Sequence, residues 1–314
     1  MEWYHYLIII TFTILVLILI TTYISFKITF YANRKKVKSD EFTLPPDPIY
    51  QTHKERILEA YKKAKTLNYI EMEITSFDGL KLKGKYFECA KNAPIEIMFH
   101  GYRGDSLSDL SVGIERCFKL NRNCLLVDQR ASGNSEGKVI SFGINESKDC
   151  LLWINKVIET FGNDVKIILT GISMGATTVV ITSGKKLPKN VVGILADCGF
   201  HSAKEIIKKT IKEMHLPVKI FYPFVKLAAK IFGHFNLEET SAINEVKKST
   251  VPIIFFHGLN DTIVPHYMSK AMYDACNTRK QLVSIKDAGH GLAYIIEPDL
   301  YLNELDNFFK DDLN

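Results

Sequence analysis

The first hydrophobic segment of the chain contains no charged residue. Residues 7–26 lack Asp, Glu, Lys and Arg and are mostly Ile, Leu, Val, Phe and Thr. A helix of twenty such residues is about 30 Å long, which matches the hydrocarbon thickness of a bilayer. Aromatic residues flank both ends of the run, as they do at the two interfaces of a membrane. The pattern predicts one transmembrane helix.

The segment that follows changes from extended chain to alternating patterns. Residues 39–48 contain three prolines and predict an extended linker. Residues 49–67 place apolar side chains at roughly every fourth position among many charges, which predicts one amphipathic surface helix. Residues 69–88 alternate polar and apolar side chains around Asp78 and Gly79, a pair that is typical of a β-hairpin turn.

From residue 94 onward, short continuous apolar runs alternate with amphipathic segments. The expected strands are 95–99, 124–127, 167–170, 191–196, 252–256 and 281–285, and the expected helices are 107–120, 146–161, 267–276 and 298–310. Buried strands that alternate with helices predict an α/β fold, with a mainly parallel sheet covered by helices on both faces. Ligands in such sheets bind at the carboxyl ends of the strands.

A G-x-S-x-G pattern follows one of these strands directly. Residues 171–175 read Gly-Ile-Ser-Met-Gly and lead into a run rich in Ala, Thr and Val, which is expected to continue as a helix. A sharp turn between a strand and a helix exposes a serine hydroxyl for attack, and glycines are needed where the backbone packs this closely. The sequence therefore predicts Ser173 as a nucleophile.

A second G-x-S-x-G pattern lies at residues 133–137. Here Ser135 is followed by Glu136, whose carboxylate would oppose a developing oxyanion. Residues 138–143 do not have the pattern of a helix. These differences favour Ser173 over Ser135.

A serine nucleophile requires a base that takes its proton and a carboxylate that orients the base. His290 follows the last predicted strand and is the best placed of nine histidines, with His257 and His100 as rivals at other strand ends. Asp261 follows the strand before it and is the candidate acid, with Asp197 as its rival.

The order Ser173, Asp261, His290, with each residue after a strand, resembles the α/β-hydrolase superfamily over residues 70–314. The stretches F-H-G-Y-R-G and D-Q-R-A-S-G-N-S-E-G, at 99–104 and 128–137, resemble those of serine-aminopeptidase-like lipases and acyl-protein thioesterases.

This resemblance has three implications, two for the site and one for the N-terminal segment. The backbone N–H groups of Tyr102 and Met174 are expected to form the oxyanion hole. Asp128 and Arg130 are expected to brace the loop next to it, which gives the second G-x-S-x-G pattern a structural role. The relatives commonly carry an N-terminal membrane segment.

The residues that flank the apolar run argue against a signal peptide and indicate an orientation in the membrane. The six residues before the apolar run carry one acidic residue and no Lys or Arg, and no small-residue cleavage site follows the run, which argues against a signal peptide. Basic residues follow the run, at Lys27, Arg34, Lys35, Lys36 and Lys38. The positive-inside rule then places the catalytic domain in the cytoplasm. The net charge of +5 is modest and shows no pattern of nucleic-acid binding.

A lysine-rich segment, residues 201–236, lies where this fold inserts its lid. It is expected to form a helix up to Met214 and a second helix after Pro223, each with an apolar face and a lysine face. Two interpretations stay open. One is an ordinary solvated lid whose apolar faces pack on the domain. The other is an interfacial lid whose apolar faces wall an acyl pocket while its lysines contact anionic headgroups.

These expectations divide the chain into an anchor with a basic flank (1–38), a linker with an amphipathic helix (39–68) and a hydrolase domain (69–314) with a helical lid at about 201–248. The expected function is cleavage of carboxylic esters or thioesters through a Ser-His-Asp triad and an acyl-enzyme intermediate. Acyl esters, thioesters or lipidated proteins at the membrane are the expected substrates, without a metal or organic cofactor. A serine peptidase and a non-catalytic scaffold are the alternatives.

Overall fold

The computed structural model describes residues 2–32 and 48–313. The predicted linker before Pro48 lies outside the described residues, as do all the basic residues of the predicted flank except Lys27.

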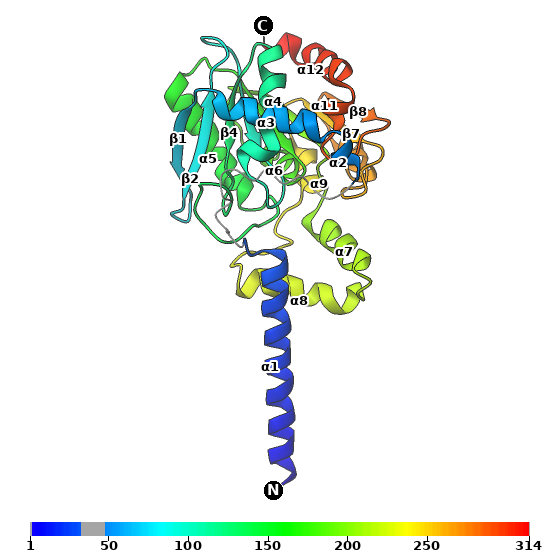
Figure 1. Cartoon of the computed structure of the whole chain (residues 1–314). Coiled ribbons are helices and arrows are strands. Elements are labelled where there is room, and N and C mark those ends of the chain that lie inside the picture. Colours follow the sequence, from blue (N-terminus) through cyan, green and yellow to red (C-terminus); the bar gives the residue numbers. More distant parts are fainter. Residues whose placement is uncertain (1, 33–47, 314) are drawn as a thin grey trace.

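Helix α1 (Trp3–Thr29) extends away from the rest of the molecule and meets it only at its C-terminal end (Figure 1). Most of its apolar side chains are exposed, and Thr22 and Phe26 near its end are buried. Among the described residues, α1 is the one helix long and apolar enough to cross a membrane. Because the described part of the chain leaves this surface uncovered, water is an unfavourable environment for it.

The sheet has eight strands in the order β1-β2-β4-β3-β5-β6-β7-β8. The strands are β1 (Ile70–Thr75), β2 (Lys81–Phe87), β3 (Ile95–Phe99), β4 (Asn123–Val127), β5 (Ile167–Ile172), β6 (Val191–Asp197), β7 (Ile253–Gly258) and β8 (Lys280–Ile285). Strands β1 and β2 form the predicted antiparallel hairpin, and β2 pairs antiparallel with β4. The other pairs are parallel, so the prediction of a mainly parallel sheet is confirmed.

Helices cover both faces of this sheet. The helices beyond α1 are α2 (Pro48–Thr52), α3 (Lys54–Thr66), α4 (Ser106–Lys119), α5 (Glu146–Phe161), α6 (Met174–Ser183), α7 (Ala203–Glu213), α8 (Val218–Ile231), α9 (Ala242–Glu245), α10 (Tyr267–Ala275), α11 (Ala293–Ile296) and α12 (Pro298–Leu313), with a 3₁₀ turn at Val246–Lys248. On β5, Ile167 and Leu169 belong to the cluster that contains Trp153 of α5. Ile168 points the other way and packs in the cluster of Phe309 of α12. This alternation is the reason why a continuous apolar run forms a strand buried on both sides.

Two predicted helices differ from the structure. The single helix expected at 49–67 is interrupted at His53, so α2 and α3 are separate. The second lid helix begins at Val218 instead of after Pro223, and continues through that proline. Pro223 is exposed, so the carbonyl of Lys219 that loses its helical partner can accept a hydrogen bond from water.

Candidate active site

Ser173 occupies a strained turn between β5 and α6. Its backbone has φ 56° and ψ −118°, in a region that residues with a side chain rarely adopt. A Cβ atom on Gly171 would lie 2.1 Å from the carbonyl carbon of Gly175, and one on Gly175 would lie 2.0 Å from the carbonyl oxygen of Phe99. Only glycine fits at these two positions, which explains the spacing of the G-x-S-x-G pattern.

The structure brings Ser173, His290 and Asp261 together in one hydrogen-bonded chain. The Nε2 atom of His290 lies 2.8 Å from Oγ of Ser173, and Nδ1 lies 2.7 Å from Oδ2 of Asp261. The other oxygen of Asp261 accepts hydrogen bonds from the backbone N–H groups of Ile263 and Val264. Burial opposes ionisation of Asp261, but hydrogen bonds from His257 and His290 outweigh it and lower its pKa to about 2. Asp261 is therefore ionised at neutral pH and suited to orient an imidazole.

The rival histidines occupy structural positions. His257 is fully buried, with Nδ1 2.7 Å from Oγ of Ser269 and Nε2 3.1 Å from Oδ2 of Asp261. His100 is also buried, and its Nε2 accepts a hydrogen bond from the backbone N–H of Gln129. Neither ring bonds to Ser173, so His290 is the histidine that can take its proton.

The rival acid is not connected to His290. The carboxyl group of Asp197 accepts a hydrogen bond of 2.9 Å from the hydroxyl of Tyr301. Its Oδ1 atom is buried and has no partner within the part of the chain that the structure describes. Burial raises the pKa of Asp197 to about 6. The backbone of Asp197 has a separate role, since its carbonyl accepts the N–H of Ser173.

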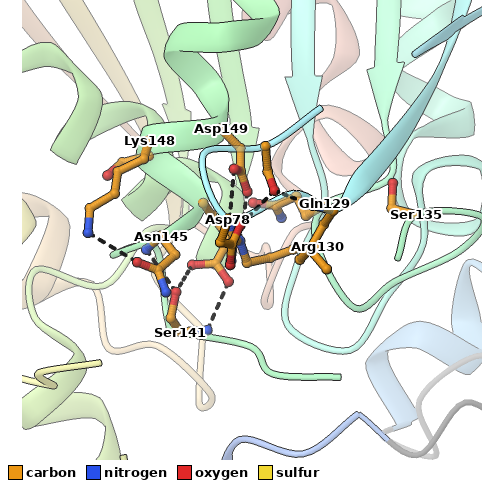
Figure 2. Close-up of polar contacts among 12 residues, drawn as sticks. Asp78, Gln129, Arg130, Ser135, Ser141, Asn145, Lys148 and Asp149 are labelled. Atoms are coloured by element: carbon orange, nitrogen blue, oxygen red, sulfur yellow. Dashed lines mark hydrogen bonds and ion pairs between the residues drawn. The ribbon is translucent and has the colours of Figure 1, made fainter. Parts of the chain in front are cut away.

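The second G-x-S-x-G serine is not accessible. Ser135 is fully buried, accepts a hydrogen bond from the backbone N–H of Lys83 and donates to the carbonyl of Asp128. Figure 2 shows it apart from the charged cluster of the same loop. Its hydroxyl is used to hold this loop against β2.

The charged residues of that loop form the expected brace. Arg130 lies between Asp149, at 2.7 Å, and Asp78 in the β1–β2 turn, at 3.0 Å (Figure 2). The carboxylate of Asp128 accepts hydrogen bonds from the backbone N–H groups of Ser106 and Asn134. These bonds join the loop to α5, to the hairpin and to the start of α4.

Two backbone N–H groups next to Ser173 are available for a ligand. The N–H of Met174 is the first of α6 and has no partner within the helix. The loop with Tyr102 lies against Ser173, because a Cβ atom on Gly101 would lie 3.6 Å from that of Ser173. Within the described residues, neither N–H donates to a protein acceptor. The arrangement is compatible with the predicted oxyanion hole, whose role stays a prediction.

The loop that contains Tyr102 is bonded to the end of α1. The hydroxyl of Tyr102 donates to the carbonyl of Thr29 at 2.8 Å, and Arg103 donates to the carbonyl of Ile28 at 2.6 Å. Phe30 is fully buried, and its backbone carbonyl accepts the N–H of Ile140. Carbonyl groups at a helix C-terminus lack helical partners and commonly accept such bonds. The sequence patterns gave no indication that the apolar helix reaches the candidate site.

A cavity of about 650 Å³ adjoins Ser173 and His290. Its walls include Met98, Leu110 of α4, and Tyr50 and Ile57 of α2 and α3. The hydroxyl of Tyr50 donates to the backbone carbonyl of His290. Helices α2 and α3 were not predicted to reach the site.

Helices α7 and α8 do not line this cavity. Of the two open interpretations, the one in which their apolar faces wall an acyl pocket is therefore wrong, and packing of these faces on the domain agrees with the structure. Ile207 of α7 and Val225 of α8 pack instead in a cluster with Phe26, Phe30 and Phe142. An amphipathic pattern identifies a buried face but does not identify the surface that buries it.

One set of potential metal ligands falls within the site. The donor atoms of Cys198, Asp261 and His290 all lie within 4.8 Å of one another. Burial raises the pKa of Cys198 well above its usual value, which disfavours the thiolate that binds metals. The ring of His290 is also engaged with Ser173 and Asp261. This set fits a proton relay better than a metal site.

A sequence model of the prolyl oligopeptidase family matches residues 141–314, more than half of the chain. The chain belongs to the prolyl oligopeptidase family. The matched segment contains Ser173, Asp261 and His290. The resemblance to the α/β-hydrolase superfamily is confirmed, and the protein is a hydrolase by family.

Similar proteins support this fold. The uncharacterized protein YqkD of Bacillus subtilis (strain 168) is 25% identical over 257 residues, which are 79% of this chain and 82% of YqkD. An esterase from Pyrococcus furiosus has a TM-score of 0.64 at 22% identity, covering 81% of this chain and 94% of the esterase. An acylaminoacyl peptidase from Pyrococcus horikoshii has a TM-score of 0.58 at 17% identity, covering 81% of this chain and 43% of the peptidase.

The first prediction separates the two serines. Ser173→Ala is expected to abolish hydrolysis and covalent labelling by a fluorophosphonate, because the remaining site can bind an oxyanion but has no nucleophile. Ser135→Ala is the matched control and is expected to keep the label, since its hydroxyl is buried. Loss of labelling in the control with retention in Ser173→Ala would show that the nucleophile is misassigned.

The second prediction concerns the acid. Asp261→Asn is expected to lower kcat by roughly 10⁴-fold, because an amide does not hold the imidazole in the required tautomer. Asp197→Asn is expected to lower kcat far less. Steady-state rates at equal thermal stability measure the difference, and the opposite ranking would move the acid to Asp197.

Asp197 is also expected to affect how the free energy of unfolding depends on pH. Its folded-state pKa of about 6 lies above that of an unfolded Asp, about 3.9, so the native state binds more protons between these values. The free energy of unfolding is therefore expected to fall as pH rises from about 4 to 6. Chemical denaturation of Asp197→Asn should lack this part of the fall.

The third prediction concerns the bonds between α1 and the loop after β3 that contains Tyr102 and Arg103, which is called the oxyanion loop for its predicted role. Arg103→Gln is expected to lower kcat by roughly three- to tenfold with little change in KM, because the loop loses a charged hydrogen bond to α1. Arg103→Lys should restore part of the rate. Arg279→Gln, which removes an exposed arginine that pairs with Asp312, is the control. Equal kcat for Arg103→Gln and Arg279→Gln would show that the bonds to α1 do not position the loop.

Proposed function

We propose that this protein is a membrane-anchored serine hydrolase that cleaves carboxylic esters or thioesters. The observation that carries the proposal is the hydrogen-bonded chain from Ser173 through His290 to Asp261, with Ser173 in a strained turn that lines a cavity. Strain is retained at such a residue where it places a reactive side chain.

In the proposed mechanism, Oγ of Ser173 attacks the carbonyl carbon while Nε2 of His290 takes its proton. Asp261 holds the imidazolium through Nδ1. The N–H groups of Tyr102 and Met174 stabilise the oxyanion, which is commonly the largest electrostatic contribution to such reactions. His290 then protonates the leaving alcohol or thiol, and the acyl group stays on Ser173. A water molecule, deprotonated by His290, releases the acid and regenerates the serine.

The cavity favours an acyl group as the part of the substrate that it holds. Apolar side chains such as Met98, Leu110 and Ile295 contribute to its lining. Its volume of about 650 Å³ is within the usual range of small-molecule sites. Acyl esters, acyl thioesters or lipidated proteins are therefore the proposed substrates.

The membrane location is proposed from α1. Its exposed apolar surface has the length of a bilayer span. Lys27 in its last turn, with the basic residues that follow, favours a cytoplasmic position for the hydrolase domain by the positive-inside rule.

A serine peptidase is the second candidate function. It is favoured by the family match and by the likeness to the acylaminoacyl peptidase. The same three side chains can cleave amides, so the substrate must distinguish the two candidates.

The fourth prediction ranks the three bond types. The purified full chain in detergent is expected to hydrolyse nitrophenyl esters and acyl thioesters with kcat/KM well above that for aminoacyl and acylaminoacyl anilides of similar size. Rates are expected to rise from acetyl to medium-length acyl chains, because longer chains bury more apolar area in the cavity. Ser173→Ala controls for background hydrolysis. Faster cleavage of the anilides would favour the peptidase, and no labelling or turnover would favour a scaffold.

The fifth prediction concerns orientation. Protease added outside intact cells is expected to leave the hydrolase domain uncut, since that domain is proposed to lie in the cytoplasm. The same protease should cut it once the membrane is permeabilised. Release of a soluble domain from intact cells would contradict the cytoplasmic placement.

A further inference from the structure

Helix α8 exposes a stripe of apolar side chains that the described residues leave partly uncovered. Ile220, Phe224, Leu227 and Ile231 recur at intervals of four, three and four residues, so they lie on one side of the helix. Ile220 is 56% exposed and Ile231 is 43% exposed, while Phe224 and Leu227 between them are half-buried. This stripe is distinct from the face that packs on the domain, where Tyr222, Val225 and Ala229 are buried.

A second stripe next to it carries positive charge. Lys219, Lys226 and Lys230 recur at intervals of seven and four residues and are all exposed. Lys226 pairs with Glu238 at 2.6 Å. Lys219 and Lys230 have no carboxylate partner within the described part of the chain. A helix with adjacent apolar and lysine stripes is typical of a membrane interface.

The position of α8 matches that of an interface. Figure 1 shows α8 across α1 near the C-terminal end of α1, on the side of the domain from which α1 emerges. The ring of Phe232, just after α8, lies 5.3 Å from that of Tyr23 and 5.7 Å from that of Phe26. Phe26 is the last residue of the charge-free run 7–26. Helix α8 is therefore at the level where a bilayer that surrounds α1 changes from hydrocarbon to headgroups.

We propose that α8 lies flat on an anionic phospholipid surface, with its apolar stripe between the acyl chains and its lysine stripe at the phosphates. This inference rests on the proposed insertion of α1 in a membrane and adds a second, specific contact to it. Lysines near an anionic surface are attracted to its phosphates and add to the binding of an apolar stripe. The two contacts together fix the orientation of the domain, because α1 alone permits rotation about its axis.

This orientation has a consequence for the candidate site. The oxyanion loop is bonded to the last turn of α1 through Tyr102 and Arg103. With α1 and α8 both held in the bilayer, that loop lies close to the membrane surface. Substrates that sit in the membrane interface would then reach Ser173 without leaving it completely. In this arrangement α8 orients the enzyme and does not wall the acyl cavity.

Lipid crosslinking in the full chain tests the proposal. A photoreactive benzoylphenylalanine replaces Ile220 or Ile231 in protein reconstituted into vesicles of phosphatidylcholine and phosphatidylglycerol. The same probe at Leu15 of α1 is the positive control, and at Phe77 and Leu300, which are also exposed, it is the negative control. The expected result is lipid adducts at positions 15, 220 and 231, several-fold above those at 77 and 300, as measured by mass spectrometry.

The lysine stripe is tested in the same vesicles. The double variant Lys219→Gln, Lys230→Gln is expected to lower the share of phosphatidylglycerol among the adducts at position 231. Lys62→Gln, Lys310→Gln is the matched control, since both lysines are exposed on α3 and α12, at the opposite end of the domain from α1 in Figure 1. An unchanged share in the first variant would contradict the role of the lysines.

Two other outcomes would overturn the proposal, and they are distinguishable. Lipid adducts at Leu15 but not at 220 and 231 would show that α8 faces water while α1 is inserted. Crosslinks from 220 and 231 to protein, with lipid adducts at Leu15, would show that α8 faces a partner protein or a second copy. Lipid adducts at none of the three positions would show that α1 is not inserted, and the proposed membrane anchor would fail together with the role of α8.

Discussion

The close approach of two glycines at the turn before α6 is the constraint on which the candidate site depends. Gly171 lets β5 meet α6, and Gly175 lets α6 meet the end of β3, at distances that a methyl group would prevent. The turn holds Ser173 at a positive φ, and the carbonyl of Asp197 on the neighbouring strand accepts its N–H. The strain is thus maintained by the parallel pairing of β5 with β6. The cost of such a backbone conformation is on the order of 1–3 kcal/mol, which the buried sheet can offset.

The same turn brings together residues that are far apart in the chain. Met174 presents its free N–H because α6 begins there, and β7 and β8 end in the loops that carry Asp261 and His290. The oxyanion loop follows a fourth strand, β3, and is hydrogen-bonded to α1. The apolar helix is therefore part of the architecture around the site as well as a proposed anchor. A chain that lost α1 would lose the buried ring of Phe26 and the hydrogen bonds from Tyr102 and Arg103 to α1.

Much of this architecture could be predicted because its patterns are local. Strand β3 and helix α5 have the predicted limits, since runs of buried side chains and helical periodicity are properties of single segments. The G-x-S-x-G pattern at 171–175 is one short stretch after a strand. The candidate acid and base also each lie in a short stretch after a strand. One-turn helices such as α9 and α11 are too short for a periodic pattern and were missed.

Contacts between distant segments could not be read from the sequence. The bond from Tyr50 to His290 joins residues 240 positions apart, and neither residue type indicates the other. The same reason applies to α7 and α8, whose apolar faces were recognised while two surfaces, the domain and an acyl pocket, stayed open as the surface that buries them. A periodic sequence pattern shows that one face of a helix is buried, and only the fold shows which surface buries it.

Trapping the acyl-enzyme would test the central claim most directly. The full chain is mixed rapidly with a nitrophenyl ester of medium chain length, quenched in acid and digested with trypsin, and the peptides are weighed. The account predicts a burst of nitrophenol that approaches one equivalent per chain, and an acyl group on the peptide 167–185, at Ser173. Turnover without a burst and without an adduct, or an adduct on a different peptide, would contradict it.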